Sequence, residues 1–294
     1  MSDFFKIRMV FENMPEILKY LPITLELAVV SFLASLLVGL VLALVKIKKI
    51  PVLYQLTEAF ISVIRGTPVL VQLYVAYFGI PMVLKFINLQ YGTNWNVNGI
   101  PAILYAIVAL SLNQSAYNAE TLRAALQSVE KGQIEAATTL GMTPFQTLIR
   151  IVIPEAFTVA LPSLSNSLIA MVKSTSLAFV CAVVDMTAAG KIIGGRTYRY
   201  FEVYVSLAII YWIITIVIEQ AEKLIERKIR IPEDVPVPKR SKAETKDASA
   251  GKALRVEKTE ASALKALQTE KTEAEGKERE TWQKSDLKKE KILT

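Results

Sequence analysis

Ionisable and amide side chains interrupt the apolar stretches of this chain at three places. Glu58 and Arg65 are seven residues apart, so on a helix they would share one face. Polar groups cannot be left facing lipid without a large desolvation cost, so these side chains should face a helix-bundle interior or a wet path. For Arg65, holding a helix end near the cytoplasm and a role along a path both remain open. For the other two clusters the alternatives are hydrogen bonding between helices and a role along a path. The other two clusters comprise Asn113, Gln114, Asn118 and Glu120, and then Lys173, Ser174, Thr175 and Ser176.

Several kinds of chemistry are excluded by composition. The chain has no histidine, which removes His-based acid–base catalysis, triads and metal sites, and Cys181 is its only cysteine, so no intrachain disulfide or thiolate zinc site can form. Gly190-Lys191 and Gly251-Lys252 lack the upstream glycine and the following hydroxyl residue of a phosphate-binding loop. We therefore expect no catalytic residues, no metal and no cofactor. If ATP drives the activity, another polypeptide must bind it.

Long apolar segments must position the polar clusters. The chain is 52% hydrophobic, although residues 232–294 hold nearly half of its charged residues. We predict an all-α polytopic membrane protein with about five spans. The spans are Leu21–Val45, a second helix from Pro51 through Ile80, Gly99–Ala119, a span within Phe157–Val184, and Val203–Ile218.

The distribution of Lys and Arg predicts the topology. Basic residues follow the first, third and fifth spans and mark cytoplasmic ends, which places the N-terminus outside. Three further cations, Lys191, Arg196 and Arg199, fall in a predicted exterior loop and are the weak point of this topology. The cytoplasmic markers are Lys46, Lys48 and Lys49, then Arg123, Lys131 and Arg150, and finally Lys223, Arg227, Lys228 and Arg230.

The same pattern divides the chain into three parts. Residues 1–20 form an extracytoplasmic segment, residues 21–230 the transmembrane domain, and residues 231–294 a charged cytoplasmic tail. Prolines begin the tail, and Ala, Glu, Lys and Thr dominate it, so we expect disorder or loose helix. A helix that meets a cytosolic partner remains the alternative.

The stretch from Gln133 to Pro154 predicts two short helices joined by a tight turn. Glu135, Ala136 and Ala137 favour a first helix with a small face suited to close docking, and Gly141 stands where its end needs positive φ. An N-cap at Thr143 followed by Pro144 predicts a restart, and Pro154 is predicted to close the second helix.

This stretch resembles the cytoplasmic "EAA" loop of ABC importer permeases. The match comprises Glu135-Ala136-Ala137, then Gly141 after three residues, then Ile151 after nine more, and Ile153-Pro154, with Ile153 in place of the usual leucine. Arg65–Leu73, Ser115–Glu120 and Lys173–Leu177 are similar to permeases for polar amino acids, and the resemblance covers roughly residues 15–228. It implies the MetI-like fold of type I ABC importer permeases, with a coupling helix that docks on an ATP-binding subunit.

The resemblance also implies partners and a cargo. We expect a dimer of ATP-binding subunits, an extracytoplasmic amino-acid-binding protein, and a second permease copy or a sister permease, in a bacterial cytoplasmic membrane. A zwitterionic cargo needs donors for its carboxylate and acceptors for its ammonium, and the polar clusters with Arg65 supply both. The run Lys191–Glu202 resembles cystine permeases, which makes L-cystine the preferred single cargo.

Two other function classes are weighed against this expectation. An ion-coupled secondary carrier predicts inverted repeats with paired broken helices, and the five unequal spans show no such repeat. A membrane sensor or scaffold would act through the charged tail, and deletion of the tail would separate it from a permease.

Overall fold

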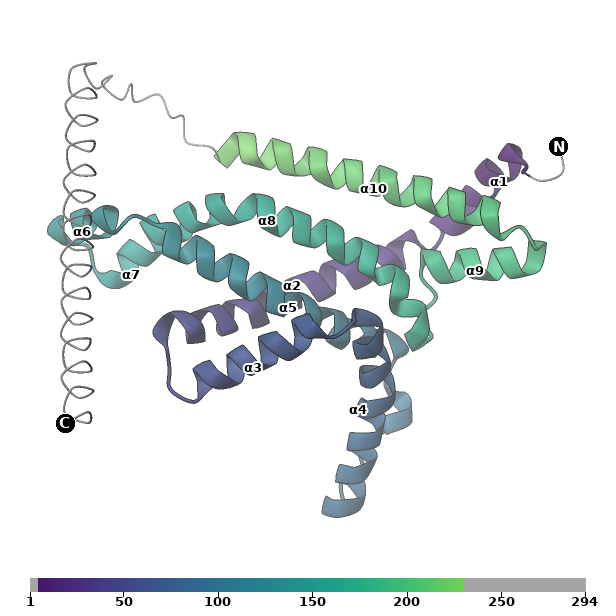
Figure 1. Ribbon diagram of the computed structural model, residues 1–294, viewed down its shortest axis with the longest axis horizontal. Coiled ribbons are helices and arrows are strands. Elements are labelled where there is room, and N and C mark those ends of the chain that lie inside the picture. Colours follow the sequence, from purple (N-terminus) through teal and green to yellow (C-terminus); the bar gives the residue numbers. More distant parts are fainter. Residues whose placement is uncertain (1–4, 230–294) are drawn as a thin grey trace, which may run out of the picture. The chain divides into compact units, whose positions relative to one another are not determined.

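The computed structural model describes residues 5–229, and this part of the chain consists of helices and turns without a strand (Figure 1). The predicted tail at 231–294 lies outside the described residues. The helices are α1 (Ile7–Leu18), α2 (Leu21–Lys48), α3 (Leu53–Gly66), α4 (Val69–Tyr91), η1 (Val97–Gly99), α5 (Ala102–Ser128), α6 (Lys131–Thr139), α7 (Pro144–Thr147), η2 (Leu148–Val152), α8 (Ile153–Ser174), η3 (Thr175–Cys181), α9 (Met186–Thr197) and α10 (Tyr200–Ile229).

Four helical segments within the described residues are long and apolar enough to cross a membrane. They are α2, α4, the segment from α7 to η3, and α10. The predicted third span, α5, is less apolar because its second half carries the amides and Glu120. It packs against α2, α3, α4 and α8, so its polar residues are turned into the bundle instead of toward lipid. The all-α polytopic prediction, with about five crossings, is confirmed.

Small side chains let α2 and α5 pack closely. Ser31, Ser35, Gly39 and Ala43 recur every four residues on the buried face of α2. A Cβ at Gly39 would lie 3.1 Å from the backbone nitrogen of Ala119 on α5, so any larger residue would require the two helices to shift slightly apart. In membranes, small residues at such spacing let two helix backbones approach closely and gain van der Waals contact. This pair of helices forms the central packing contact of the fold.

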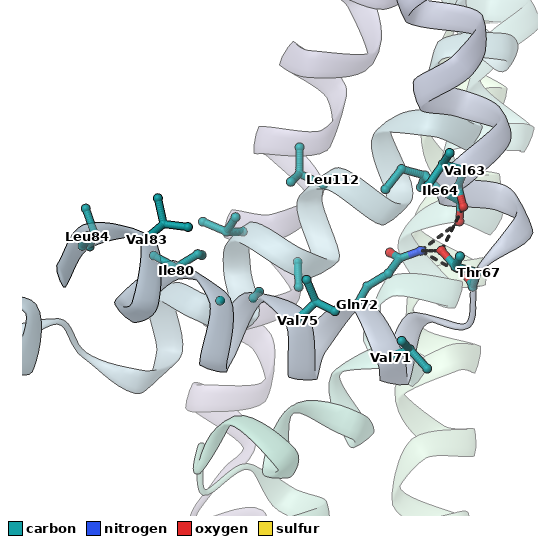
Figure 2. A pocket seen from close by; sticks show the side chains of 14 residues that line it. Val63, Ile64, Thr67, Val71, Gln72, Val75, Ile80, Val83, Leu84 and Leu112 are labelled. Carbon is teal, nitrogen blue, oxygen red and sulfur yellow. Dashed lines mark hydrogen bonds between the residues drawn. The ribbon is translucent and has the colours of Figure 1, made fainter. Parts of the chain in front are cut away.

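The predicted second helix from Pro51 through Ile80 is divided into two helices at Pro68, where the sequence favours a bend. The chain breaks at Thr67 and Pro68, and the extended backbone at Pro68 (ψ 136°) separates α3 from α4. The Gln72 amide bridges the break, donating to the Ile64 carbonyl at 2.9 Å and to Thr67 Oγ1 at 2.8 Å. Figure 2 shows this side chain reaching back across the bend, with α3 and α4 running in clearly different directions. The bend sets the position of Arg65 in the last turn of α3.

The predicted exterior loop before the last span contains helix α9. Asp185 is fully buried and caps α9, with Oδ1 accepting from the Ala188 N–H at 2.9 Å. Two of the unexpected cations of this loop have acidic partners. Arg196 donates to both carboxylate oxygens of Glu16 on α1, at 3.0 and 2.8 Å, and Arg199 pairs with Glu202 at 3.4 Å.

Candidate coupling loop and polar pocket

A short helix, α6, leaves the end of α5 and forms the first half of the candidate coupling loop (Figure 1). Its end is a Schellman turn, in which the Met142 N–H bonds to the Ala137 carbonyl at 3.1 Å and the Gly141 N–H to the Thr138 carbonyl at 3.0 Å. Gly141 has φ of +79°, so the prediction that this position needs positive φ is confirmed. The turn fixes the direction in which the chain leaves α6.

The restart after the turn is a capping box. Thr143 Oγ1 accepts from the Gln146 N–H at 3.3 Å, and the Gln146 side chain accepts from the Thr143 N–H at 2.9 Å. Pro144 occupies the first turn of α7, where no N–H is needed. The sequence prediction of an N-cap at Thr143 is confirmed.

The prediction that Pro154 closes the second helix is wrong. Helix α7 continues through the π-helical turn η2 into α8, and Pro154 lies in the first turn of α8. In η2 the Ile153 N–H bonds back to the Leu148 carbonyl, so the bonding pattern shifts before the proline. The missing N–H of Pro154 then falls where the helix can tolerate it. The loop is therefore joined rigidly to a membrane-spanning helix.

The exposed face of the loop differs from the expected one. Ala137 is only 2% exposed, so it packs inside the loop, whereas Ala136 and Glu135 are exposed. Two large apolar side chains at the tip are exposed to solvent, Leu140 at 82% and Phe145 at 69%. The small-face prediction therefore holds for Ala136 and fails for Ala137.

A polar pocket of about 580 Å³ lies where α3, α5 and α8 meet. This volume is within the range of small-molecule sites, roughly 300–1,000 Å³. Its walls carry amide, hydroxyl and charged groups, and Arg65 lies over the ring of Tyr117 at 5.2 Å. The lining residues are Arg65, Asn113, Gln114, Tyr117, Glu120, Thr121, Asn166, Ser167, Ala170 and Ser174.

The pocket gathers five of the predicted path residues, namely Arg65, Asn113, Gln114, Glu120 and Ser174. The other four lie outside its lining. Asn118 is buried behind it and donates to Ser35 Oγ at 2.9 Å, and Thr175 is buried with its hydroxyl on the Val172 carbonyl at 2.7 Å. Lys173 is exposed, and Ser176 bonds to the Lys173 carbonyl at 2.6 Å.

Sequence reasoning identified Ser174 but missed the rest of the contribution of α8 to this pocket. Asn166, Ser167, Ala170 and Ser174 recur at intervals that place them on one helical face. Small and polar residues at that spacing inside an apolar helix were the signal that could have revealed them. Thr121 was missed in the same way.

A four-residue ionic network stands beside the pocket. Lys46 at the end of α2 donates to Glu58 on α3 at 2.7 Å and also to Glu120 on α5. Arg123 donates to the other oxygen of Glu120 from Nε and Nη2, at 2.9 Å each. Lys46, read from the sequence only as a topology marker, is therefore a structural link between three helices.

A second cavity, of about 610 Å³, opens between α3, α4 and α5 and is almost wholly apolar (Figure 2). Its polar lining residues, Thr67 and Gln72, hydrogen bond to each other. The carbonyl oxygen of Gln72 also accepts from Asn113 Nδ2 at 3.0 Å. This cavity offers little to a zwitterion, but the Gln72 side chain that borders it orients a wall residue of the polar pocket.

Comparison with known proteins places this geometry in context. Residues 35–231 match the family described as binding-protein-dependent transport system inner membrane component. The probable amino-acid permease protein YxeN of Bacillus subtilis (strain 168) is 41% identical over 218 residues, covering 74% of this chain and 93% of YxeN. The L-cystine transport system permease protein TcyL of the same organism is 34% identical over 230 residues, covering 78% of this chain and 94% of TcyL.

A solved structure agrees with these relatives. The crystal structure of an amino acid ABC transporter with histidines contains a chain 36% identical to this one, with a TM-score of 0.63, and the match covers 76% of this chain and 99% of that one. A bundle of apolar helices with a polar pocket and a capped helical loop thus defines the permease subunit of an ABC amino-acid importer. The chain belongs to the family of binding-protein-dependent transport system inner membrane components. It is a transport component and not an enzyme, and ATP hydrolysis takes place in a separate subunit.

Proposed function

We propose that this permease moves a polar amino acid across a bacterial cytoplasmic membrane through the polar pocket, with L-cystine as the preferred single cargo. The observation that carries the proposal is the pocket itself, because it gathers amide, hydroxyl and charged groups within an otherwise apolar bundle, where polar residues mark substrate paths. Two observations support cystine: the similarity of the chain to TcyL, and the run Lys191–Glu202, which resembles cystine permeases. Arg65, Asn113, Gln114, Glu120 and Ser174 are the proposed path residues.

The loop formed by α6 and α7 is the proposed contact with the ATP-binding subunit. Glu135, Ala136 and the turn at Gly141 present the exposed face, with Ala137 supporting it from inside. Leu140 and Phe145 would bury apolar surface in a groove of the partner. Because Pro154 lies in a helix continuous with the loop, a push on α6 and α7 would be transmitted directly to α8.

The proposed assembly has two permease subunits, either two copies of this chain or this chain with a sister permease. Two ATP-binding subunits would sit at the cytoplasmic face, and an extracytoplasmic binding protein would deliver the amino acid. Closure of the ATP-binding subunits draws the docked loops together and turns the pocket outward, and hydrolysis returns it inward. This requires the N-terminal segment to lie outside and the tail at 231–294 to lie in the cytoplasm.

Uptake by a strain lacking this gene tests the cargo. Labelled cystine, glutamine, histidine and arginine are offered separately to the deletion strain and to the strain complemented with the gene. We expect cystine uptake to fall in the deletion strain and to return on complementation. Unchanged uptake of all four amino acids would refute an amino-acid cargo.

A further inference from the structure

The two charged residues that line the polar pocket differ in their capacity to bind a cargo. Arg65 and Glu120 are its charged lining residues. Both carboxylate oxygens of Glu120 already accept from cations, one from Lys46 and one from Arg123. Lys46 is shared with Glu58, so two cations and two carboxylates form a network with no net charge. Glu120 therefore has little capacity left for a cargo ammonium group.

Arg65, in contrast to Glu120, keeps its capacity to bind a charged group of the cargo. No carboxylate within the described residues pairs with its guanidinium, which is exposed and rests over the face of Tyr117 at 5.2 Å. A ring face leaves the edge of the guanidinium, with its N–H donors, free to bind another group. A carboxylate matches that edge in a two-pronged hydrogen bond. The pocket thus presents one uncompensated positive charge.

The amides beside Arg65 offer acceptors without charge. Asn113 donates to Gln72 and Gln114 donates to Asn118, at 3.0 and 3.3 Å. Within the described part of the chain, neither of their carbonyl oxygens accepts a hydrogen bond from another side chain. These two oxygens can accept from an ammonium group but cannot neutralise an additional cation.

We infer that Arg65 binds the α-carboxylate of the cargo and that the pocket selects amino acids with neutral or acidic side chains over those with cationic ones. The inference rests on the proposed function, since it takes the cargo to be an amino acid. A zwitterion places its carboxylate on Arg65 and its ammonium on the Asn113 and Gln114 oxygens. The side-chain cation of arginine or lysine would enter a pocket whose one carboxylate is already neutralised and whose free charge is positive.

Binding to the purified permease tests this selectivity without the specificity of the extracytoplasmic binding protein. The permease is purified with its ATP-binding subunits in detergent, and equilibrium binding of labelled glutamine, glutamate, cystine, arginine and lysine is measured. We expect arginine and lysine to bind at least about tenfold more weakly than glutamine. Glutamine α-carboxamide, which lacks the carboxylate, should also bind at least about tenfold more weakly than glutamine.

Variants at Arg65 separate a carboxylate contact from a structural role. In Arg65→Gln, the preference for glutamine over its α-carboxamide should fall to near unity, whereas a mere packing defect would weaken both ligands alike. Arg65→Lys should restore part of the preference, which keeps the test valid if Arg65→Gln is unstable. Lys85→Gln, an exposed cation on α4 outside this pocket, is the matched control and should bind like the wild type.

The failure of this inference and the failure of the proposed function give different results. Equal binding of glutamine, arginine and lysine to the wild type, or an unchanged carboxylate preference in Arg65→Gln, would overturn the role of Arg65 alone. Absence of binding by any amino acid, in a complex that still supports uptake in cells, would show that this pocket is not the binding site. Loss of the gene without an effect on any amino-acid uptake would instead overturn the proposed function.

Discussion

At the scale of single residues, Gly141 is the position in the loop where the backbone conformation restricts the residue type most. Its φ of +79° is strained for a β-branched side chain, yet a Cβ there would meet no atom within 4 Å. Gly141→Val should therefore cost about 1–3 kcal/mol of backbone strain, confined to the loop. We expect the variant to reach the membrane in normal amounts while uptake and co-purification of the ATP-binding subunit both fall.

Gly132 provides a matched control for that substitution. It also has open space around its Cβ position, but it lies within α6 and has no positive φ. Gly132→Val should keep most of the uptake and most of the bound ATP-binding subunit. Equal behaviour of the two variants would mean that the turn geometry at Gly141 is unimportant for coupling.

Residue-level features of this loop were predictable to the extent that they depend on local backbone rules. The positive φ at Gly141 and the cap at Thr143 follow from steric limits and from unpaired N–H groups, which act within a few residues. Burial of Ala137 was not predictable in this way, because it depends on how α6 contacts α7 and η2.

At the scale of elements, Lys46 holds the ends of α2, α3 and α5 together. Its side chain is only 10% exposed, and it is the shared donor for Glu58 and Glu120. Lys46→Met would leave Glu120 with Arg123 alone and α3 without its ionic link to α2. We expect a loss of about 1–3 kcal/mol, seen as a lower melting temperature of the detergent-solubilised complex.

Lys48→Met removes a cation two residues away that takes no part in the network, and it should leave the melting temperature nearly unchanged. Restoration of the wild-type melting temperature in Lys46→Arg would support the ionic explanation. A melting temperature for Lys46→Met equal to that of the wild type would rule out a stabilising role for this network.

The helices themselves were largely predictable, and their junctions were not. Apolar length located α2, α8 and α10 because burial in lipid requires it. The break at Pro68 lies where a proline favours a bend, whereas the continuity of the helix at Pro154 is opposite to the prediction. At Pro68, the Gln72 side chain donates to the Ile64 carbonyl that the break leaves without a helical partner. At Pro154, the π turn just before the proline lets the helix continue despite the missing N–H. Such compensation depends on neighbours that a local pattern does not reveal.

At the scale of the whole molecule, the distribution of Lys and Arg predicts an orientation in the membrane. A reporter active only in the cytoplasm should work when fused after Lys49, Lys131 or Lys239 and should be silent near Asn94. Activity at Asn94 would overturn the arrangement with the N-terminus outside. In the predicted exterior loop, Arg196 pairs with Glu16 and Arg199 with Glu202, whereas Lys191 lies over the ring of Phe179.

The class of the protein could be derived from separated motifs, whereas the pocket could not. The loop spacing and the polar clusters point to a permease because several separated motifs match that family in the same order. Which polar residues share a cavity depends on the bend that places Arg65 near α5 and on the face of α8 that meets it. These are consequences of three-dimensional packing.

ATP-driven uptake in proteoliposomes is the decisive measurement for a permease coupled through its loop. Vesicles contain this chain with the ATP-binding subunits, and the extracytoplasmic binding protein delivers labelled cystine. Cystine should accumulate only when ATP is present on the side of the ATP-binding subunits, and Gly141→Val should abolish most of that accumulation. Accumulation driven by an imposed ion gradient without ATP would instead identify a secondary carrier and refute the importer assignment.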